Sequence, residues 1–593
     1  MIIQLSESRG IEILQSFSTE EELIRRALVK ASGNIWHDRS PDALTLWQEV
    51  GIEDAGEMAQ ADRYTEKFQP TLANEYLFVE KRRFERALGG LFTVCTMIKD
   101  LPGRKSVLLI SDGFPDLSSK TLESIVYQEA YGQNEKSTDY YLNIRSDTGR
   151  MRIFDPFNIL DLNKVLSGEE VLRELIRFAN AQNISIYALD PDMFIKYLIQ
   201  TSAEYGPKDV ISQPMELRAK DKISRVQNLR WLSEDTGGVS LRGATKYERF
   251  YEVMSSDLNY YYQLSYYPPR KEPDNSYHRI GVKVKRPGVD IRSRKGYTDY
   301  SDKKEEKMSL VSAFYNPALF KELPFKAEFV FFHRDSTKFE PWINIALPAK
   351  ELFLERKVEF GQKNFDLYVW VKDTQKGERA FGGQITLPFT IDDSFMDFIK
   401  TTDYLCLHYK GRAIPVSQKE YQTIFALYDE DTDELGTWEA MISLPDLKNK
   451  KQGELINCVL GFTAANPKKG KNFFSLSQED GSLVFGEMKF YPAVVNQFQR
   501  MQNASVFLQV YLPLGKSKVE PEFKVSGEGR IAQEIHGQLV AEDWNGKSKV
   551  WSGIFALDLS TVIFGQYSLH LEISVTEGSP PLTKDLNLIK LRY

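Results

Sequence analysis

Short apolar runs alternate with stretches of helical periodicity over roughly the first 300 residues. The runs 107–110 and 184–189 consist almost entirely of apolar residues, which predicts strands that are covered on both faces. Asp112 closely follows the first run and Asp190 directly follows the second. The pattern predicts βα units around a largely parallel sheet, and the carboxyl ends of such strands are the usual place for function.

Three segments of this region carry helix signals. Ser18 with Glu21, and Ser167 with Glu170, have the Ser-x-x-Glu spacing of a capping box, and a third helix is predicted over 78–100. Each predicted helix has one apolar stripe, which we expect to be buried. The stripe residues are Leu23, Ala27 and Leu28; Leu172, Leu175, Ile176 and Ala179; and Phe84, Leu88, Leu91, Cys95 and Ile98.

Two segments of the first half lack this periodicity. Residues 131–166 are rich in turn formers and predict a long surface insertion. Residues 298–308 are charged and have few apolar side chains, which predicts a linker.

The rest of the chain shows strand patterns alone, separated by turn signals, as is typical of antiparallel sandwiches. We therefore predict a doubly wound α/β domain over 1–300, an immunoglobulin-like sandwich over 309–447, a connecting segment with short strands over 448–499, and a second such sandwich over 500–593. The predicted strands are 328–332, 342–347, 365–371, 384–389, 404–408 and 423–428 in the first sandwich, and 505–512, 535–540, 551–557, 567–575 and 586–591 in the second.

The charge pattern argues against nucleic acid as a partner. The formal net charge is −7 over 593 residues and both signs are interleaved, so no broad positive field exists. The one basic stretch, 283–295, has the alternating spacing of a solvated strand face. No apolar run reaches the 18 residues of a membrane-spanning helix, and the first residues lack the basic start and apolar stretch of a signal peptide.

No catalytic motif is visible in the sequence. The three cysteines and six histidines are scattered singly, so we interpret the cysteines as buried free thiols and the histidines as structural. There is no nucleophile elbow, phosphate loop or dinucleotide fingerprint. Neighbouring carboxylates, such as Asp190 with Asp192, are better explained as surface charge than as acid–base pairs. We therefore expect the chain not to be an enzyme.

Tyrosines gather at positions 260, 261, 262, 266 and 267. They could form a binding platform for a sugar or a peptide. Alternating aromatics over 262–267 also fit a strand with one face packed on a helix, which we favour.

Several strings of the first 300 residues together resemble the von Willebrand factor type A (VWA)-related domain of acidobacterial-type proteins. They are LPGRKSVLLISDGF at 101–114, ISIYALDP at 184–191, LSEDTGG at 232–238, YYYQLSYYP at 260–268 and YHRIGVKVKRPGVDIRSRKGY at 277–297. The resemblance covers about half the chain. It implies a doubly wound sheet with a divalent cation, suited to Mg²⁺, at the carboxyl ends of its strands.

The resemblance implies one metal ligand. Asp112 matches the family's aspartate after the fourth strand, whereas the Asp-x-Ser-x-Ser motif after the first strand has no match and no threonine ligand can be placed. Residues 1–5 and 11–15 look like the family's second and third strands, so the first strand is missing and we expect an N-terminal piece to be absent from this sequence. Asp112 could equally cap the turn that follows it.

Taken together, these features favour a protein-binding or adhesion module of VWA type, with a degenerate or truncated metal site. By the same resemblance, we expect it outside the cytoplasm, bound to a protein ligand or another envelope protein. A structural envelope or scaffold protein without metal dependence and a cryptic hydrolase remain as alternatives. A deep pocket with convergent polar groups would favour the hydrolase.

Overall fold

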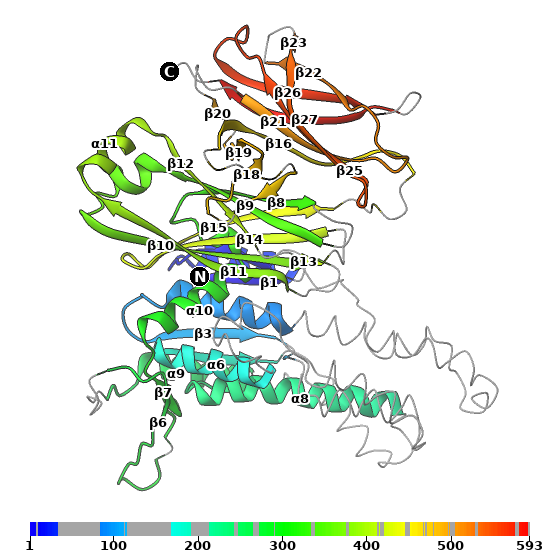
Figure 1. Cartoon of the computed structure of the whole chain (residues 1–593). Coiled ribbons are helices and arrows are strands. Elements are labelled where there is room, and N and C mark those ends of the chain that lie inside the picture. Colours follow the sequence, from blue (N-terminus) through cyan, green and yellow to red (C-terminus); the bar gives the residue numbers. More distant parts are fainter. Residues whose placement is uncertain are drawn as a thin grey trace, which may run out of the picture. The chain divides into compact units, whose positions relative to one another are not determined.

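The chain forms a mixed α and β structure with a large β-rich region, seen in a computed structural model (Figure 1). It divides into two compact units, Met1–Asn316 and Pro317–Tyr593. The description covers all residues except 7–9, 34–83, 112, 115–167, 191–212, 242–246, 265–271, 290, 334–337, 375–378, 412–413, 416–419, 445–446, 448–450, 467, 469–470, 472, 478, 496, 499–503, 528–531, 576–579 and 591–593. The predicted insertion over 131–166 lies outside these described residues.

A parallel sheet forms the centre of the first unit. Its described strands β3 (Lys105–Ile110), β4 (Ile184–Leu189) and β5 (Ser240–Leu241) are neighbours in that order, and α6 (Gly168–Ala181) and α8 (Gln213–Asp235) lie between them in sequence. Every residue of β4 is buried, as predicted. The prediction for β3 is wrong for one face, because Leu108 and Ile110 are 37% and 55% exposed.

Helices cover both faces of β4. Ile184, Ile186 and Ala188 join a core with α6, α8 and the helical residues 84–98. Tyr187 and Leu189 pack instead against Phe250 of α9 (Tyr247–Asn259). The alternation of a strand therefore divides the side chains of β4 between two apolar clusters.

Two of the three predicted helical stripes are confirmed. The four positions in α6 are buried, and so are the five in the helix over 84–98. In α1 (Glu21–Gly33) only Ala27 is buried, whereas Leu23 and Leu28 are 37% and 52% exposed, so that prediction is wrong for two positions of three. The Ser18 hydroxyl accepts a hydrogen bond from Glu20 N at 3.0 Å, and not from Glu21 N as the predicted capping box requires.

The linker prediction over 298–308 is wrong. This segment contains the beginning of α10 (Asp302–Tyr315), and Met308 and Val311 belong to the core of the first unit. The apolar residues of α10 begin only in its second turn, so its first turn has the composition of a linker. The hairpin of β1 (Ile2–Ser6) and β2 (Gly10–Gln15) is tied to the end of this helix, since Ile11 N donates to Asn316 Oδ1.

The sheets of the second unit are antiparallel except for the pair β20 and β27, and the predicted strands are confirmed except 535–540, which spans the end of β23 and the start of β24 in two different sheets. In the first sandwich, β11-β10-β14-β15 faces a sheet in which β9 pairs with β8, β12 and β13. These strands span Arg379–Ile391 (β11), Gly361–Asp373 (β10), Glu420–Asp429 (β14), Glu434–Ser443 (β15), Lys326–His333 (β8), Lys338–Pro348 (β9), Tyr404–Lys410 (β12) and Ile414–Pro415 (β13). The short helix α11 (Asp393–Thr401) follows β11 and is capped by Asp392.

The second sandwich pairs a seven-stranded sheet, β17-β18-β19-β16-β21-β25-β24, with a five-stranded sheet, β20-β27-β26-β22-β23. Residues 454–498, which the sequence analysis assigned to the connecting segment, contribute β16 to β20. The strands are Glu454–Ala465 (β16), Ser475–Leu476 (β17), Leu483–Phe485 (β18), Met488–Pro492 (β19), Gln497–Phe498 (β20), Ala504–Tyr511 (β21), Glu520–Ser526 (β22), Gln533–Ile535 (β23), Gly537–Asn545 (β24), Val550–Leu557 (β25), Gly565–Ser574 (β26) and Leu582–Lys590 (β27).

A further apolar cluster joins the two sandwiches. Val330, Phe332 and Trp342 from the first pack against residues of the seven-stranded sheet, among them Phe490 and Phe507. The indole of Trp342 also donates to Gly481 O at 2.8 Å. Strand β8 is therefore apolar on both faces, because its odd residues fill the core of the first sandwich and Val330 and Phe332 fill the contact with the second.

Candidate functional site

The sequence predicts a functional site at the carboxyl end of the parallel sheet. Asp112 lies outside the described residues, whereas its neighbours Ser111 and Gly113 are described. Ser111 Oγ accepts a hydrogen bond from Gly113 N at 3.1 Å, and Gly113 has φ +101°. Gly113 therefore makes a turn that other residues rarely adopt, and in the described residues Ser111 provides a side-chain cap for it.

Asp190 is the other aspartate predicted at this edge, and it lies there, 2% exposed, directly after β4. Among the described residues, no three His, Cys, Asp or Glu side chains gather closely enough to hold a metal ion. Mg²⁺ prefers six oxygen ligands. Asp190 and Ser111 do not supply such a set by themselves, so we derive no chemistry through a metal at this edge.

The tyrosine cluster is arranged differently from the packing that we favoured. Tyr260 and Tyr262 are 82% and 98% exposed, and the described part of the segment, 260–264, forms no strand. Tyr261 lies under the guanidinium of Arg104, 5.5 Å from its ring centroid. The favoured packing, a strand over 262–267 with one face on a helix, is therefore wrong for Tyr262, while residues 265–267 of that segment lie outside the described residues.

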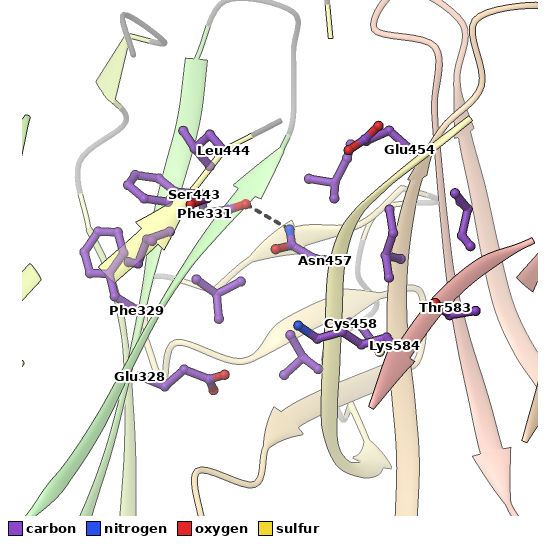
Figure 2. Close-up of a pocket in the computed structure, with 16 residues that line it drawn as sticks. Glu328, Phe329, Phe331, Ser443, Leu444, Glu454, Asn457, Cys458, Thr583 and Lys584 are labelled. Carbon is purple, nitrogen blue, oxygen red and sulfur yellow. Dashed lines mark hydrogen bonds between the residues drawn. The ribbon is translucent and has the colours of Figure 1, made fainter. Parts of the chain in front are cut away.

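A cleft of about 470 Å³ opens between the two sandwiches of the second unit (Figure 2). Its walls come from β8, the end of β15, the first half of β16 and the start of β27. The cleft lies beside the apolar contact between the sandwiches, because Val330 and Val459 belong to both. Sequence reasoning missed this site, since β8 and β27 are each more than 100 residues away from β15 and β16 in the chain.

Glu328 is the carboxyl group on the β8 wall of the cleft. Burial raises its pKa to about 7, against a smaller lowering by a hydrogen bond from Asn344. Asn344 is its direct neighbour on β9, and the next neighbour across the sheet is His408 on β12. A polar row thus crosses three strands on the face that is turned toward the second sandwich.

Two further ionisable groups reach the cleft from the second sandwich. Cys458 comes from β16, and burial raises the pKa of its thiol to about 12, although nearby Lys584 opposes this shift. Lys584 comes from β27, and Figure 2 shows its side chain extending past Cys458 in the direction of Glu328. The thiol is therefore uncharged at neutral pH, between one acidic and one basic group.

Side-chain amides border the cleft along the edge of β8. Asn457 Nδ2 donates to Phe331 O at 2.9 Å and to Gln509 Oε1 at 2.7 Å. Gln509 accepts from His333 N and donates to His333 O, both at 3.0 Å. These bonds satisfy backbone groups of β8 in the way that a neighbouring strand would. They hold the first sandwich to the second at the edge of the cleft.

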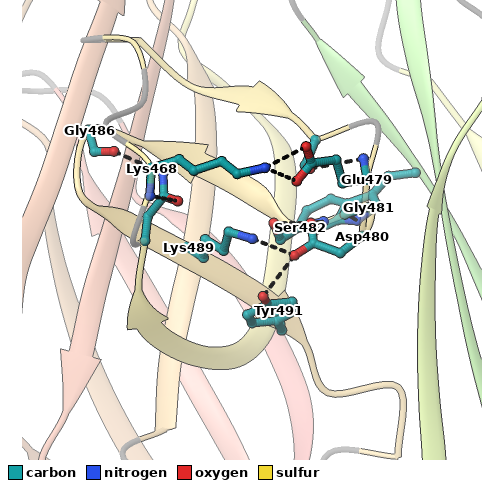
Figure 3. Close-up of polar contacts among 11 residues, drawn as sticks. Lys468, Glu479, Asp480, Gly481, Ser482, Gly486, Lys489 and Tyr491 are labelled. Carbon is teal, nitrogen blue, oxygen red and sulfur yellow. Dashed lines mark hydrogen bonds and ion pairs between the residues drawn. The ribbon is translucent and has the colours of Figure 1, made fainter.

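At the His408 end of the polar row lies a cluster of polar side chains around Asp480 (Figure 3). Partial burial alone would raise the pKa of Asp480, but bonds from Lys489 at 2.5 Å and Ser482 at 2.7 Å lower it well below its usual range. Burial lowers the pKa of His408 to about 4, and nearby Asp480 only partly opposes this. His408 is thus a neutral structural residue that bonds to Asn344 at 3.0 Å.

The three cysteines are free, as predicted, but only Cys95 is fully buried; Cys458 is partly buried and Cys406 exposed. No described helix is long and apolar enough to cross a membrane.

No family model matches the chain, and no curated protein matches it either.

Proposed function

We propose that this chain is a non-enzymatic binding protein. The observation that carries the proposal is the chemistry of the cleft between the sandwiches. Polar and charged groups converge in this cleft beside aliphatic side chains, which suits ligand binding. The nucleophile in the cleft, Cys458, has a thiol with a pKa of about 12, and none of the described lining residues is a histidine that could activate it.

For the first unit we propose a VWA-type adhesion module with a degenerate metal site, to which Asp112 would contribute. Support comes from the resemblance of its sequence and from the parallel order β3-β4-β5 with helices between the strands. The partner would be a protein ligand or another envelope protein, outside the cytoplasm. It would bind at the carboxyl-end loops, where open α/β sheets usually hold their ligands.

A photo-cross-linking experiment tests this proposal. A photoreactive amino acid would replace Ser111 or Leu241 at the carboxyl edge, and Leu101 at the opposite edge as the control. In native cells we expect cross-linked partner only at the carboxyl edge, and we expect it to persist with EDTA because the metal site is degenerate. Equal cross-linking at both edges, or none at either, would favour the structural scaffold instead.

A hydrolase is the second candidate, because Glu328 has the raised pKa of a general acid and Glu454 places a second carboxyl group in the same cleft. Aryl glycosides would detect such an activity directly. Turnover that disappears in Glu328→Gln would establish the hydrolase and refute the binding-only proposal. We expect no turnover.

A further inference from the structure

Opposite charges face each other across the cleft without being paired. Glu328 lies on the wall formed by the first sandwich, and Lys584 on the wall formed by the second. Among the described residues, neither forms an ion pair within 4.0 Å, and the hydrogen bond to Glu328 comes from the uncharged amide of Asn344. Each charge is thus available to a ligand that occupies the space between them.

Aliphatic side chains also line the cleft, beside its charged and polar groups. Val330 and Val459 contribute from the contact between the sandwiches, and Leu455 and Leu582 contribute from the edge of the second core. Cys458 adds an uncharged thiol. A ligand that spans the cleft would therefore contact both charged walls and some of these apolar groups.

We propose that the cleft binds a zwitterionic ligand, with its ammonium group at Glu328, its carboxylate at Lys584 and an aliphatic segment between them. This inference rests on the proposal that the chain is a binding protein. The volume of about 470 Å³ is in the range of small-molecule sites. Free amino acids, ω-amino acids and short peptides share this chemistry but differ in the distance between their two charged groups. The charge spacing of the ligand that binds most tightly therefore identifies its class.

The surroundings of Glu328 make the binding pH-dependent. Asn344 faces it from β9, Cys458 and Glu454 from β16, and Lys584 from β27, while His408 lies one strand beyond Asn344. The carboxyl group must be ionised to pair with an ammonium group, and burial holds its pKa at about 7. Below pH 7 the affinity should therefore rise roughly tenfold per pH unit, and above about pH 7 it should level off.

Isothermal titration calorimetry on the full chain at pH 8 provides the test. The probes are leucine, 6-aminohexanoate and trileucine, with hexylamine and hexanoate as the analogues that carry one charge. We expect one zwitterion to bind at least tenfold more tightly than both analogues. Glu328→Gln and Lys584→Gln should each weaken that binding at least tenfold. Lys518→Gln, at an exposed lysine of the same sandwich, should leave it unchanged.

Three results would overturn the inference: no zwitterion binds the folded chain, a singly charged analogue binds as tightly, or Lys584→Gln has no effect. Because Lys584 is exposed, its variant should keep the fold even if Glu328→Gln does not, and circular dichroism checks both. Failure here would leave cross-linking at the carboxyl edge of the first unit unaffected, so the two proposals fail separately.

Discussion

Glu328 costs the second unit stability at neutral pH. Its pKa of about 7 exceeds the ordinary value of 4.5, so the folded chain binds more protons at this site than the unfolded chain between these values. Stability from this group is therefore complete below pH 4.5 and is lost as the pH rises through 7. We expect Glu328→Gln to stabilise the protein by about 1–3 kcal/mol at pH 8, measured by urea unfolding.

The same substitution should change stability little at pH 4.5, where the carboxyl group is already protonated. Glu522→Gln, at a carboxylate on the exposed side of β22, is the matched control and should have little effect at either pH. Equal stabilisation at both pH values would show that packing, and not ionisation, is responsible.

His408 has the opposite pH dependence. Its pKa is lowered from 6.5 to about 4 by burial, so the unfolded chain binds more protons here between these values. Its stabilising contribution is complete above pH 6.5 and falls by up to about 3 kcal/mol as the pH drops to 4. We expect His408→Gln to lose less stability than the wild type over this window, measured by urea unfolding at pH 7.5, 6 and 4.5. Parallel losses would contradict this.

At the residue scale, little of the cleft could be predicted from the sequence. Asp112 was singled out because a motif surrounds it, whereas Glu328, Cys458 and Lys584 meet only through the packing of two sandwiches. One local signal was present. Glu328 shares a strand face with Val330 and Phe332, and a strand that is apolar on both faces requires a second covering layer. A carboxyl group on such a face is a reason to look for a site.

At the scale of elements, the edge of β8 depends on one side chain of β21. Gln509 bonds both backbone groups of His333 and also Asn457 and Ser552. Gln509→Leu removes all of these bonds at once, and we expect a loss of about 2–4 kcal/mol in urea unfolding. Gln422→Leu removes an exposed bond to Glu439 and should cost under about 0.5 kcal/mol. A similar loss of stability in both variants would refute the proposal that the edge of β8 depends on Gln509.

The helix over 84–98 and α10 approach each other closely at Gly89. A Cβ atom there would lie 2.3 Å from the ring of Tyr315. We expect Gly89→Ala to destabilise the first unit by about 1–3 kcal/mol, despite the better helix propensity of alanine. At Gly90 the added atom meets the end of the Leu5 side chain, which can move, so Gly90→Ala should cost less. Thermal unfolding compares them, and a stabilising Gly89→Ala would contradict the close approach.

Element prediction succeeded where the period of the pattern was clear. The stripes of α6 and of the helix over 84–98, and the short runs between turn signals in the sandwiches, identified those elements. It failed for α10, whose first turn is charged, and for the packing of α1, because periodicity shows an apolar face without showing what covers it. The packed strand predicted from alternating aromatics over 262–267 failed at Tyr262 for the same reason.

At the scale of the whole molecule, the apolar cluster between the sandwiches makes the second unit one body. Trp342 is fully buried at its centre and packs on Phe490 and Phe507, with ring centroids 6.1 and 6.3 Å away. Pro317–Tyr593 forms one compact unit that includes both sandwiches. A cleft with one wall from each sandwich keeps its shape only if this contact holds.

Trp342→Ala tests that dependence. It removes a buried ring and a hydrogen bond to Gly481, and we expect a loss of about 3–5 kcal/mol. In wild-type protein, hydrogen exchange measured by mass spectrometry should give β9 and β21 the same opening free energy, because the sandwiches unfold together. In the variant, β9 should exchange separately from β21. Separate opening already in the wild type would mean that the sandwiches are only loosely joined, and the cleft could not hold two charges at a fixed spacing.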